Sequence, residues 1–202
     1  MTITTAHLSI SLDGFVAGAD QSREQPLGRG GIGVHTWHIG DDPHPVDRAW
    51  TERLLRPRGA YVMGRNMFGP VRGPWESDEP WSGWWGPEPP YHAPVFVLTH
   101  HEHEPIEMEG GTTFHFVTGG VEDALRQARE AGDGDVDVAG GASAVRQVLA
   151  LGELDELTLD IAPVLLGDGE RLFTPDLAHV RLEQVEAEAS PLVTHLRYRV
   201  LR

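Results

Sequence analysis

The chain has 202 residues, of which 40% are hydrophobic and 23% are charged, and its formal net charge is −15. This composition predicts one globular domain, and the negative charge argues against a protein that binds nucleic acid or an anionic membrane nonspecifically. Every cationic side chain is an arginine and there is no cysteine, which excludes a catalytic lysine, a thiolate nucleophile and a cysteine-ligated metal site.

The first quarter of the chain predicts a strand, a turn, a long loop and a helix. The strand covers residues 3–11, and the Asp13-Gly14 turn leads to a short continuation at residues 15–17. Residues 18–43 are rich in glycine and polar residues and are predicted to form a loop. Pro45 suits the first turn of a helix that runs to residue 55 and ends before the Pro57-Arg58-Gly59 stretch.

A second strand at residues 60–63 leads into a short helical turn at residues 65–68. It is followed by an unusual stretch, residues 69–93, which is rich in proline and glycine. This stretch holds four of the six tryptophans, namely Trp75, Trp81, Trp84 and Trp85. Three interpretations remain open: a packed aromatic cluster at one end of the sheet, a lid that stacks on a planar ligand, or a dimer contact.

The rest of the chain alternates strands and helices and then changes pattern. Strands are predicted at 94–99, 113–117 and 135–139, and helices at 121–132 and 142–151. Three strand-like stretches without an intervening helix follow, at 154–166, 180–189 and 193–201. The order predicts an α/β fold: a largely parallel sheet with helices on its faces and an antiparallel edge.

Two glycine turns mark possible binding sites for a dinucleotide. Gly64-Arg65-Asn66 and Gly140-Gly141-Ala142-Ser143 each follow a hydrophobic strand and open a helical pattern. Backbone N–H groups at such a turn favour an anion, and glycine lets a phosphate approach closely. Each turn alone is more typical of simple helix–sheet packing, but the pair favours nucleotide binding.

Other polar residues allow both a structural and a functional interpretation. Asp47 stands in the first turn of its helix, where a carboxylate is stabilising, but it also fits a pocket carboxylate that helps to protonate a heterocycle. Asp13 is foremost a turn residue. The histidines at 100, 101 and 103 lack the spacing of a metal site, so we predict no metal.

Targeting signals are not evident. The N-terminus lacks the basic start and apolar core of a signal peptide, and no apolar run reaches the ~20 residues of a membrane span. We therefore expect a soluble, cytoplasmic protein.

Several motifs together resemble the dihydrofolate reductase-like family, and especially the C-terminal reductase domain of the bifunctional riboflavin biosynthesis deaminase/reductase. The first strand, residues 8–17, is similar to the first strand of that fold, and the two glycine turns resemble its phosphate-binding turns. The most specific similarity is at residues 154–157 and 162–169, followed by Leu172-Phe173. The resemblance implies a three-layer α/β/α fold with a mixed sheet and antiparallel C-terminal strands. It covers nearly all of residues 1–202 as one domain, with the Trp-rich insertion its least general part.

The resemblance also implies an NADPH-dependent reductase, a homodimer and a set of site residues. Hydride would pass to a C=N or C=O carbon of a pyrimidine, pterin or related heterocycle, with the proton from Asp47 or water. One turn would contact the phosphates and the other the pyrophosphate; Thr99 and His100 would lie near the adenosine ribose, and Ala17 and Trp37 beside the nicotinamide. The cofactor-binding set is Ala17, Trp37, Gly64, Arg65, Asn66, Thr99, His100, Gly140, Gly141, Ala142 and Ser143, and the substrate pocket is assigned to His35, Asp13 and Trp85.

Some positions depart from the family pattern. Met67 stands where dihydrofolate reductases commonly carry a hydroxyl, Ala139 where the riboflavin-pathway reductases carry a glutamate, and His100 where a cation often meets the 2′-phosphate. These departures leave the substrate and the preference for NADPH over NADH open. They also keep two alternatives: a non-catalytic NADP(H)- or ligand-binding module, and a true dihydrofolate reductase.

Overall fold

A computed structural model describes residues 2–40, 42–69, 73–75 and 81–202. Part of the predicted Trp-rich insertion at 69–93, namely residues 70–72 and 76–80, lies outside the described residues.

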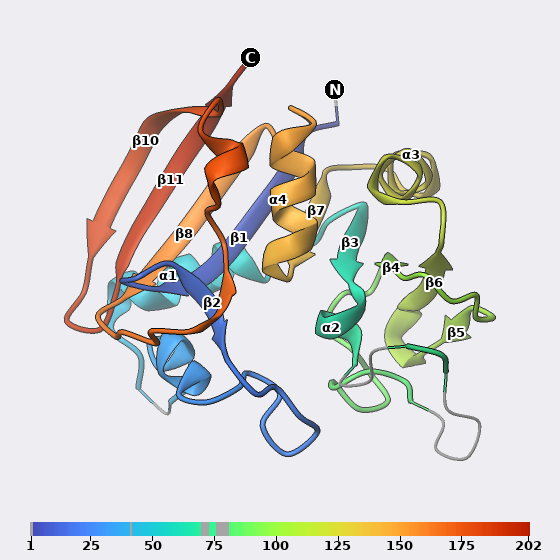
Figure 1. The fold of residues 1–202 in the computed structure, drawn as a ribbon, viewed down its shortest axis with the longest axis horizontal. Helices are drawn as coiled ribbons and strands as arrows, with labels where there is room; N and C mark the ends of the chain where they lie inside the picture. Colours follow the sequence, from blue (N-terminus) through green and yellow to red (C-terminus); the bar gives the residue numbers. More distant parts are fainter. Residues whose placement is uncertain (1, 41, 70–72, 76–80) are drawn as a thin grey trace.

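The described part of the chain contains a nine-stranded sheet, in the order β10-β11-β8-β1-β7-β3-β4-β6-β5 (Figure 1). The strands from β8 to β6 run parallel, whereas β11 and β10 at one edge and β5 at the other are antiparallel to their neighbours. Their bounds are β1 Thr4–Ser11, β3 Ala60–Gly64, β4 Pro94–Leu98, β5 Ile106–Glu107, β6 Thr113–Val117, β7 Val136–Gly140, β8 Glu156–Ala162, β10 Arg181–Ala189 and β11 Thr194–Leu201. A small separate sheet pairs β2 (Phe15–Gly18) with β9 (Gly169–Arg171).

One face of the large sheet is covered by α3 (Val121–Ala131) and α4 (Ala142–Ala150). In β1, the apolar residues Ala6, Leu8 and Ile10 alternate with polar ones and point into this layer, because successive strand side chains point to opposite faces. Figure 1 shows α4 crossing in front of the sheet. This layer forms the main hydrophobic core.

The opposite face is covered in two different ways. Over the half made of β1, β8 and β11, it packs against α1 (Pro45–Leu54) and two buried tryptophans, Trp37 and Trp50. Over the half made of β3, β4 and β6, it packs against an aromatic cluster that includes Phe68 and Phe114, together with α2 (Arg65–Phe68). The two helical sides and the sheet between them confirm the three-layer α/β/α prediction.

Helix α1 begins where the sequence predicts and ends within one residue of the predicted position. Pro45 occupies its first turn, and the His44 imidazole accepts a hydrogen bond from the Val46 N–H at 3.3 Å. Proline suits this position because its missing N–H would lack an intrahelical partner anyway. The predicted end at residue 55 differs from the observed end at Leu54 by one residue.

The remaining differences are local. The predicted loop at 18–43 contains a 3₁₀ helix, η1 (Gly31–His35), and β2, predicted as a continuation of the first strand, belongs to the small sheet. The predicted strand at 154–166 ends at Ala162, because Pro163 cannot donate a hydrogen bond to a neighbouring strand. The short strands β5 and β9 and the 3₁₀ helices η2 (Glu109–Gly111) and η3 (Pro175–Leu177) were not predicted.

Among the described residues, no helix has both the length and the apolar character needed to cross a membrane.

Candidate functional site

The two predicted glycine turns lie side by side. Strands β3 and β7 are parallel neighbours, and Met63 pairs with Gly140 at their carboxyl ends. A Cβ at Gly64 would lie 3.7 Å from the backbone nitrogen of Gly141. The fold therefore brings together two turns that are 76 positions apart in the sequence, since Gly64 and Gly140 are joined only through the sheet.

The space in front of Gly141 is open, and the backbone beside it offers unused donors. A Cβ at Gly141 would meet no atom within 4 Å, whereas one at Gly140 (φ 128°) would meet Leu8 and Met67 at 3.3 Å. Helix α4 begins at Ala142. Its N-cap residue is Gly141, so no side chain caps the N–H groups of the first turn. Unsatisfied N–H groups at a helix start favour an anionic ligand. The arrangement fits the pyrophosphate of a dinucleotide.

The Arg65 side chain packs over the ring of Trp75. Its guanidinium carbon lies 3.3 Å from the ring centroid of Trp75, and the buried Nε has no hydrogen-bond partner. Burial lowers the pKa of Arg65 to about 10, so the group keeps its charge at neutral pH. The cation–π contact holds the side chain over the aromatic cluster.

Thr99 and His100 follow the end of β4, the neighbour of β3 on the other side. Leu98 pairs with Gly64, which places Thr99 at the same edge as the glycine turns. The Thr99 hydroxyl is buried and accepts a hydrogen bond from the His101 N–H at 3.2 Å, whereas His100 is exposed. The position fits the predicted neighbourhood of the adenosine ribose.

Asp47 belongs to a buried hydrogen-bonded network, which we call the histidine–aspartate network: His7, Asp160, His195, Asp47 and Ser190. The Asp47 carboxylate accepts from the Ser190 hydroxyl at 2.9 Å and contacts His195 Nε2 at 3.0 Å. His195 Nδ1 lies 2.7 Å from Asp160, whose other oxygen lies 2.8 Å from His7 Nε2. Asp47, Asp160 and His195 are each 0% exposed, so the network is enclosed by protein.

The sheet register explains why these residues meet. His195 of β11 and Ser9 of β1 both lie opposite Asp160 of β8. In β1, His7 and Ser9 occupy the face opposite the apolar core, so the polar side chains of three adjacent strands share one surface. Helix α1 covers that surface and presents Asp47 to it.

Trp37 and Trp50 enclose the histidine at the centre of the network. The Trp50 ring stacks on His195 with a centroid distance of 4.9 Å and an interplanar angle of 3°, and the Trp37 ring meets His195 edge-on at 5.0 Å. The Trp37 indole donates to the Ser9 hydroxyl at 2.9 Å, and Trp37 is 1% exposed. Ala17, also predicted beside the nicotinamide, is buried in β2.

His35 and His38 lie at the partly exposed side of this region. His35 Nδ1 lies 3.2 Å from His38 Nε2. Burial and the neighbouring His38 lower the pKa of His35 to about 4, and burial likewise lowers the pKa of His38. Both rings are therefore neutral at pH 7 and act as hydrogen-bonding groups. Among the described residues, no group of three or more histidine, aspartate or glutamate side chains has the arrangement of a metal site.

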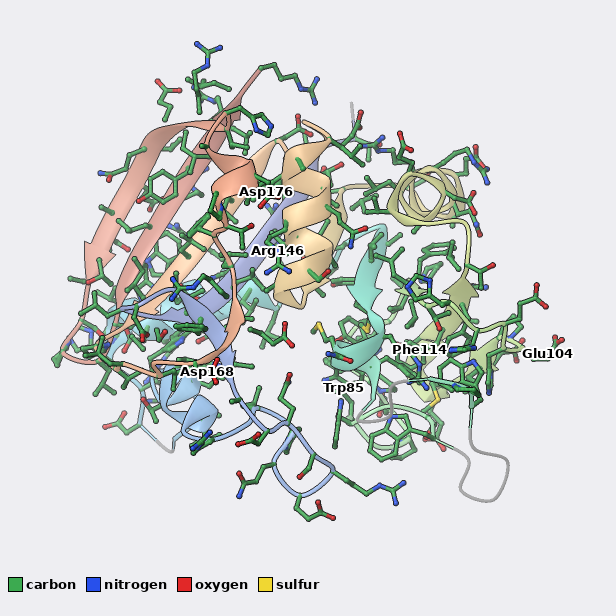
Figure 2. The ribbon with its side chains drawn as sticks, viewed as in Figure 1. Trp85, Glu104, Phe114, Arg146, Asp168 and Asp176 are labelled. Carbon is green, nitrogen blue, oxygen red and sulfur yellow. The ribbon has the colours of Figure 1, made fainter. Side chains whose placement is uncertain are left out.

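The other two residues assigned to the substrate pocket do not join His35. Asp13 ties two loops together, because its carboxylate accepts from the Ser11 hydroxyl and from the N–H groups of Gly167 and Leu166. The Ser11 hydrogen bond and these backbone donors lower its pKa to about 2. Trp85 packs against Phe114 with a centroid distance of 6.0 Å, and Figure 2 shows both to the right of Asp168. A direct substrate contact by Asp13 or Trp85 stays a prediction.

Sequence reasoning missed His7, His38, Asp160, Ser190 and His195. One signal was present: polar His7 and Ser9 alternate with apolar residues in a strand that is buried on both faces. A polar stripe in such a strand requires hydrogen-bond partners, but only the fold shows which residues these are.

Comparisons with known proteins agree with this architecture. The family described as the RibD C-terminal domain matches residues 3–196. No curated protein matches the chain.

Among solved structures, a protein from Shewanella sp. PV-4 described as a riboflavin biosynthesis protein is similar at a TM-score of 0.69 and 21% identity, with 100% of both chains covered. The deaminase/5-amino-6-(5-phosphoribosylamino)uracil reductase of Thermotoga maritima is similar at a TM-score of 0.59 and 15% identity. The match covers 98% of this chain and 56% of that chain. This chain thus spans about half the length of that bifunctional enzyme. Dihydrofolate reductase from Enterococcus faecalis, in a complex with NADP(H), is similar at a TM-score of 0.55 and 15% identity. The match covers 98% of this chain and 96% of that chain. At these identities the structural matches establish a shared fold.

Proposed function

The chain belongs to the RibD C-terminal domain family, and from that premise we propose that it is an NADPH-dependent reductase. Its substrate would be a pyrimidine, a pterin or a related heterocycle, reduced at a C=N or C=O carbon. The observation that carries the proposal is the pair of adjacent glycine turns at the carboxyl edge of the sheet, with open space before Gly141. The resemblance to reductases that act on a uracil derivative favours a pyrimidine substrate of this kind.

The residues of the two turns would hold the cofactor. Gly140, Gly141, Ala142 and Ser143 would bind the pyrophosphate through backbone N–H groups at the start of α4, and Gly64 and Asn66 would contact the phosphates from β3. When bound, NADPH supplies the hydride, and the protein contributes orientation and electrostatics. Thr99 and His100 would lie on the adenosine side.

A proton must also reach the substrate, and the burial of Asp47 argues against direct transfer from its carboxylate. Its carboxylate is 0% exposed and is bonded to both Ser190 and His195. We propose that water delivers the proton. Asp47 would contribute indirectly from behind the site, by holding helix α1 in place through its bonds to Ser190 and His195. This narrows the sequence prediction, which allowed either Asp47 or water.

The enclosure of Asp47 also favours a second candidate function, binding of NADP(H) without turnover. A catalytic carboxylate needs hydrogen-bond reach to the atom that it protonates. The two candidates differ in one result: both predict cofactor binding, but only the reductase oxidises NADPH when a substrate is added.

Two titrations test the proposal. NADPH and NADH are added separately while tryptophan fluorescence is followed, and NADPH absorbance is then monitored with a panel of pyrimidines and pterins. Binding and oxidation support the reductase, and binding without oxidation across the panel supports the second candidate. No binding of either nucleotide contradicts both. A homodimer, expected from the family resemblance, is tested separately by light scattering.

A further inference from the structure

His195 lies between two buried carboxylates, and both of its ring nitrogens face a carboxylate oxygen. The distances are 2.7 Å from Nδ1 to Asp160 and 3.0 Å from Nε2 to Asp47. A neutral imidazole donates from only one nitrogen, so the other would present its lone pair to a carboxylate oxygen. A second proton is therefore required, on either the ring or one of the carboxyl groups.

The other partners place that proton on the ring. Asp160 also accepts from His7 Nε2, and Asp47 also accepts from the Ser190 hydroxyl, so each carboxylate has the two-donor pattern of an ionised group. Burial alone lowers the pKa of His195, but the hydrogen bonds and charges of Asp160 and Asp47 outweigh burial and raise it. The parallel Trp50 ring at 4.9 Å offers its π face to the cation.

The ring contacts two residues that the sequence assigned to the site. Asp47 is bonded to Nε2, and Trp37, predicted beside the nicotinamide, meets the ring edge-on at 5.0 Å. Trp37 and helix α1, which carries Asp47, both cover this half of the sheet. His195 therefore contacts both of the segments that cover it. Resting on the proposed function, we propose that His195 is a positioning residue: as an imidazolium, it holds Asp47 and Trp37 in place behind the proposed site.

The charged and titratable groups around the His195 ring are consistent with one buried positive charge on that ring. Asp160 of β8 and Asp47 of α1 contact it directly, and the remaining groups act through these or through the tryptophans. Those groups are His7 of β1, bonded to Asp160; His38, close to Trp37; Arg53, stacked on Trp50; and Glu188 of β10, which accepts from the Trp50 indole.

The test combines nitrogen NMR of the wild-type protein with one variant and one matched control. In the wild type, both ring nitrogens of His195 should be protonated at neutral pH. In His195→Gln, the indole N–H signal of Trp37 should shift and broaden. The control, His179→Gln, replaces an exposed histidine that hydrogen-bonds to the Asp176 carbonyl, and it should leave Trp37 unchanged.

Turnover gives an independent readout. We expect His195→Gln to lower kcat at least tenfold, to change NADPH affinity less than twofold, and to remove the alkaline decline in kcat that the wild type shows as His195 deprotonates. A singly protonated ring in the wild type, or an unchanged Trp37 signal in His195→Gln, would overturn the proposal. If His195→Gln does not fold, the wild-type NMR result alone decides the charge. Failure of the wild type to bind NADPH would instead refute the proposed function, and the NMR results would still decide the role of His195.

Discussion

The edge of the sheet that carries the two glycine turns and the histidine–aspartate network lie on the same sheet but differ in the groups that form them. The edge is made of backbone: glycines at positions 64, 140 and 141, with space left open before Gly141. The network is made of side chains that are buried and joined by hydrogen bonds of 2.7 to 3.0 Å. No side chain caps the start of α4 at the edge, whereas the network satisfies its polar groups internally. The comparison therefore predicts that damage to the edge affects binding and damage to the network affects stability.

The largest effect should come from removing the central donor of the network. His195→Leu leaves Asp47 and Asp160 buried without their shared partner, and an uncompensated buried charge typically costs about 3–5 kcal/mol. Denaturant unfolding should show a loss of this size. At a temperature where the variant is still folded, NADPH affinity should stay near that of the wild type. A loss below about 0.5 kcal/mol, the range of ordinary surface substitutions, would contradict the account.

A side chain at the open glycine should affect binding and spare the fold. A Cβ at Gly141 would meet no described atom within 4 Å, so we expect Gly141→Val to leave the melting temperature unchanged. NADPH affinity should fall at least tenfold, or about 1.4 kcal/mol, because the side chain occupies the proposed pyrophosphate position. Gly40→Val is the matched control, since a Cβ there also meets no atom within 4 Å. Equal NADPH affinities for Gly141→Val and Gly40→Val would argue against a cofactor site formed by the two glycine turns.

Alkaline pH should weaken the network selectively. The pKa of His195 is raised in the folded protein, so its stabilising contribution is complete below the unfolded value of about 6.5 and is lost as pH rises through the folded value. The difference in unfolding free energy between wild type and His195→Gln should therefore shrink from neutral to alkaline pH. Unfolding curves at several pH values measure it. A difference that grows with pH would show that the ring is not the protonated group.

The smallest effect should come from Arg65→Ala. The guanidinium stacks on Trp75 and has no anion partner among the described residues, so the expected loss is about 0.5–1 kcal/mol of stability. NADPH affinity should fall less than in Gly141→Val. If it falls more, the arginine turns toward the phosphates when the cofactor binds, and the backbone is not the main contributor at this edge.

The two regions also differ in how far the sequence alone predicted them. Each glycine turn is a local pattern, a strand followed by glycine and a helix, and the sequence predicted both turns and the strands before them. Their adjacency required parallel pairing of β3 with β7, which the structure shows and the local patterns did not specify.

The network could not be predicted in the same way. His195 lies 35 positions from Asp160 and 148 from Asp47, so no local pattern links them. Asp47 was identified alone, and its helix-capping and pocket interpretations could not be separated without its partners. The alternation of polar and apolar residues in β1 indicated a polar face but not the strands that complete it.

Amide hydrogen exchange with and without NADPH tests the two-turn cradle most directly. Saturating NADPH should slow exchange in peptides that cover residues 64–66 and 140–143, and should leave the peptide around His195 unchanged. NADPH binding that protects neither glycine turn would contradict the account.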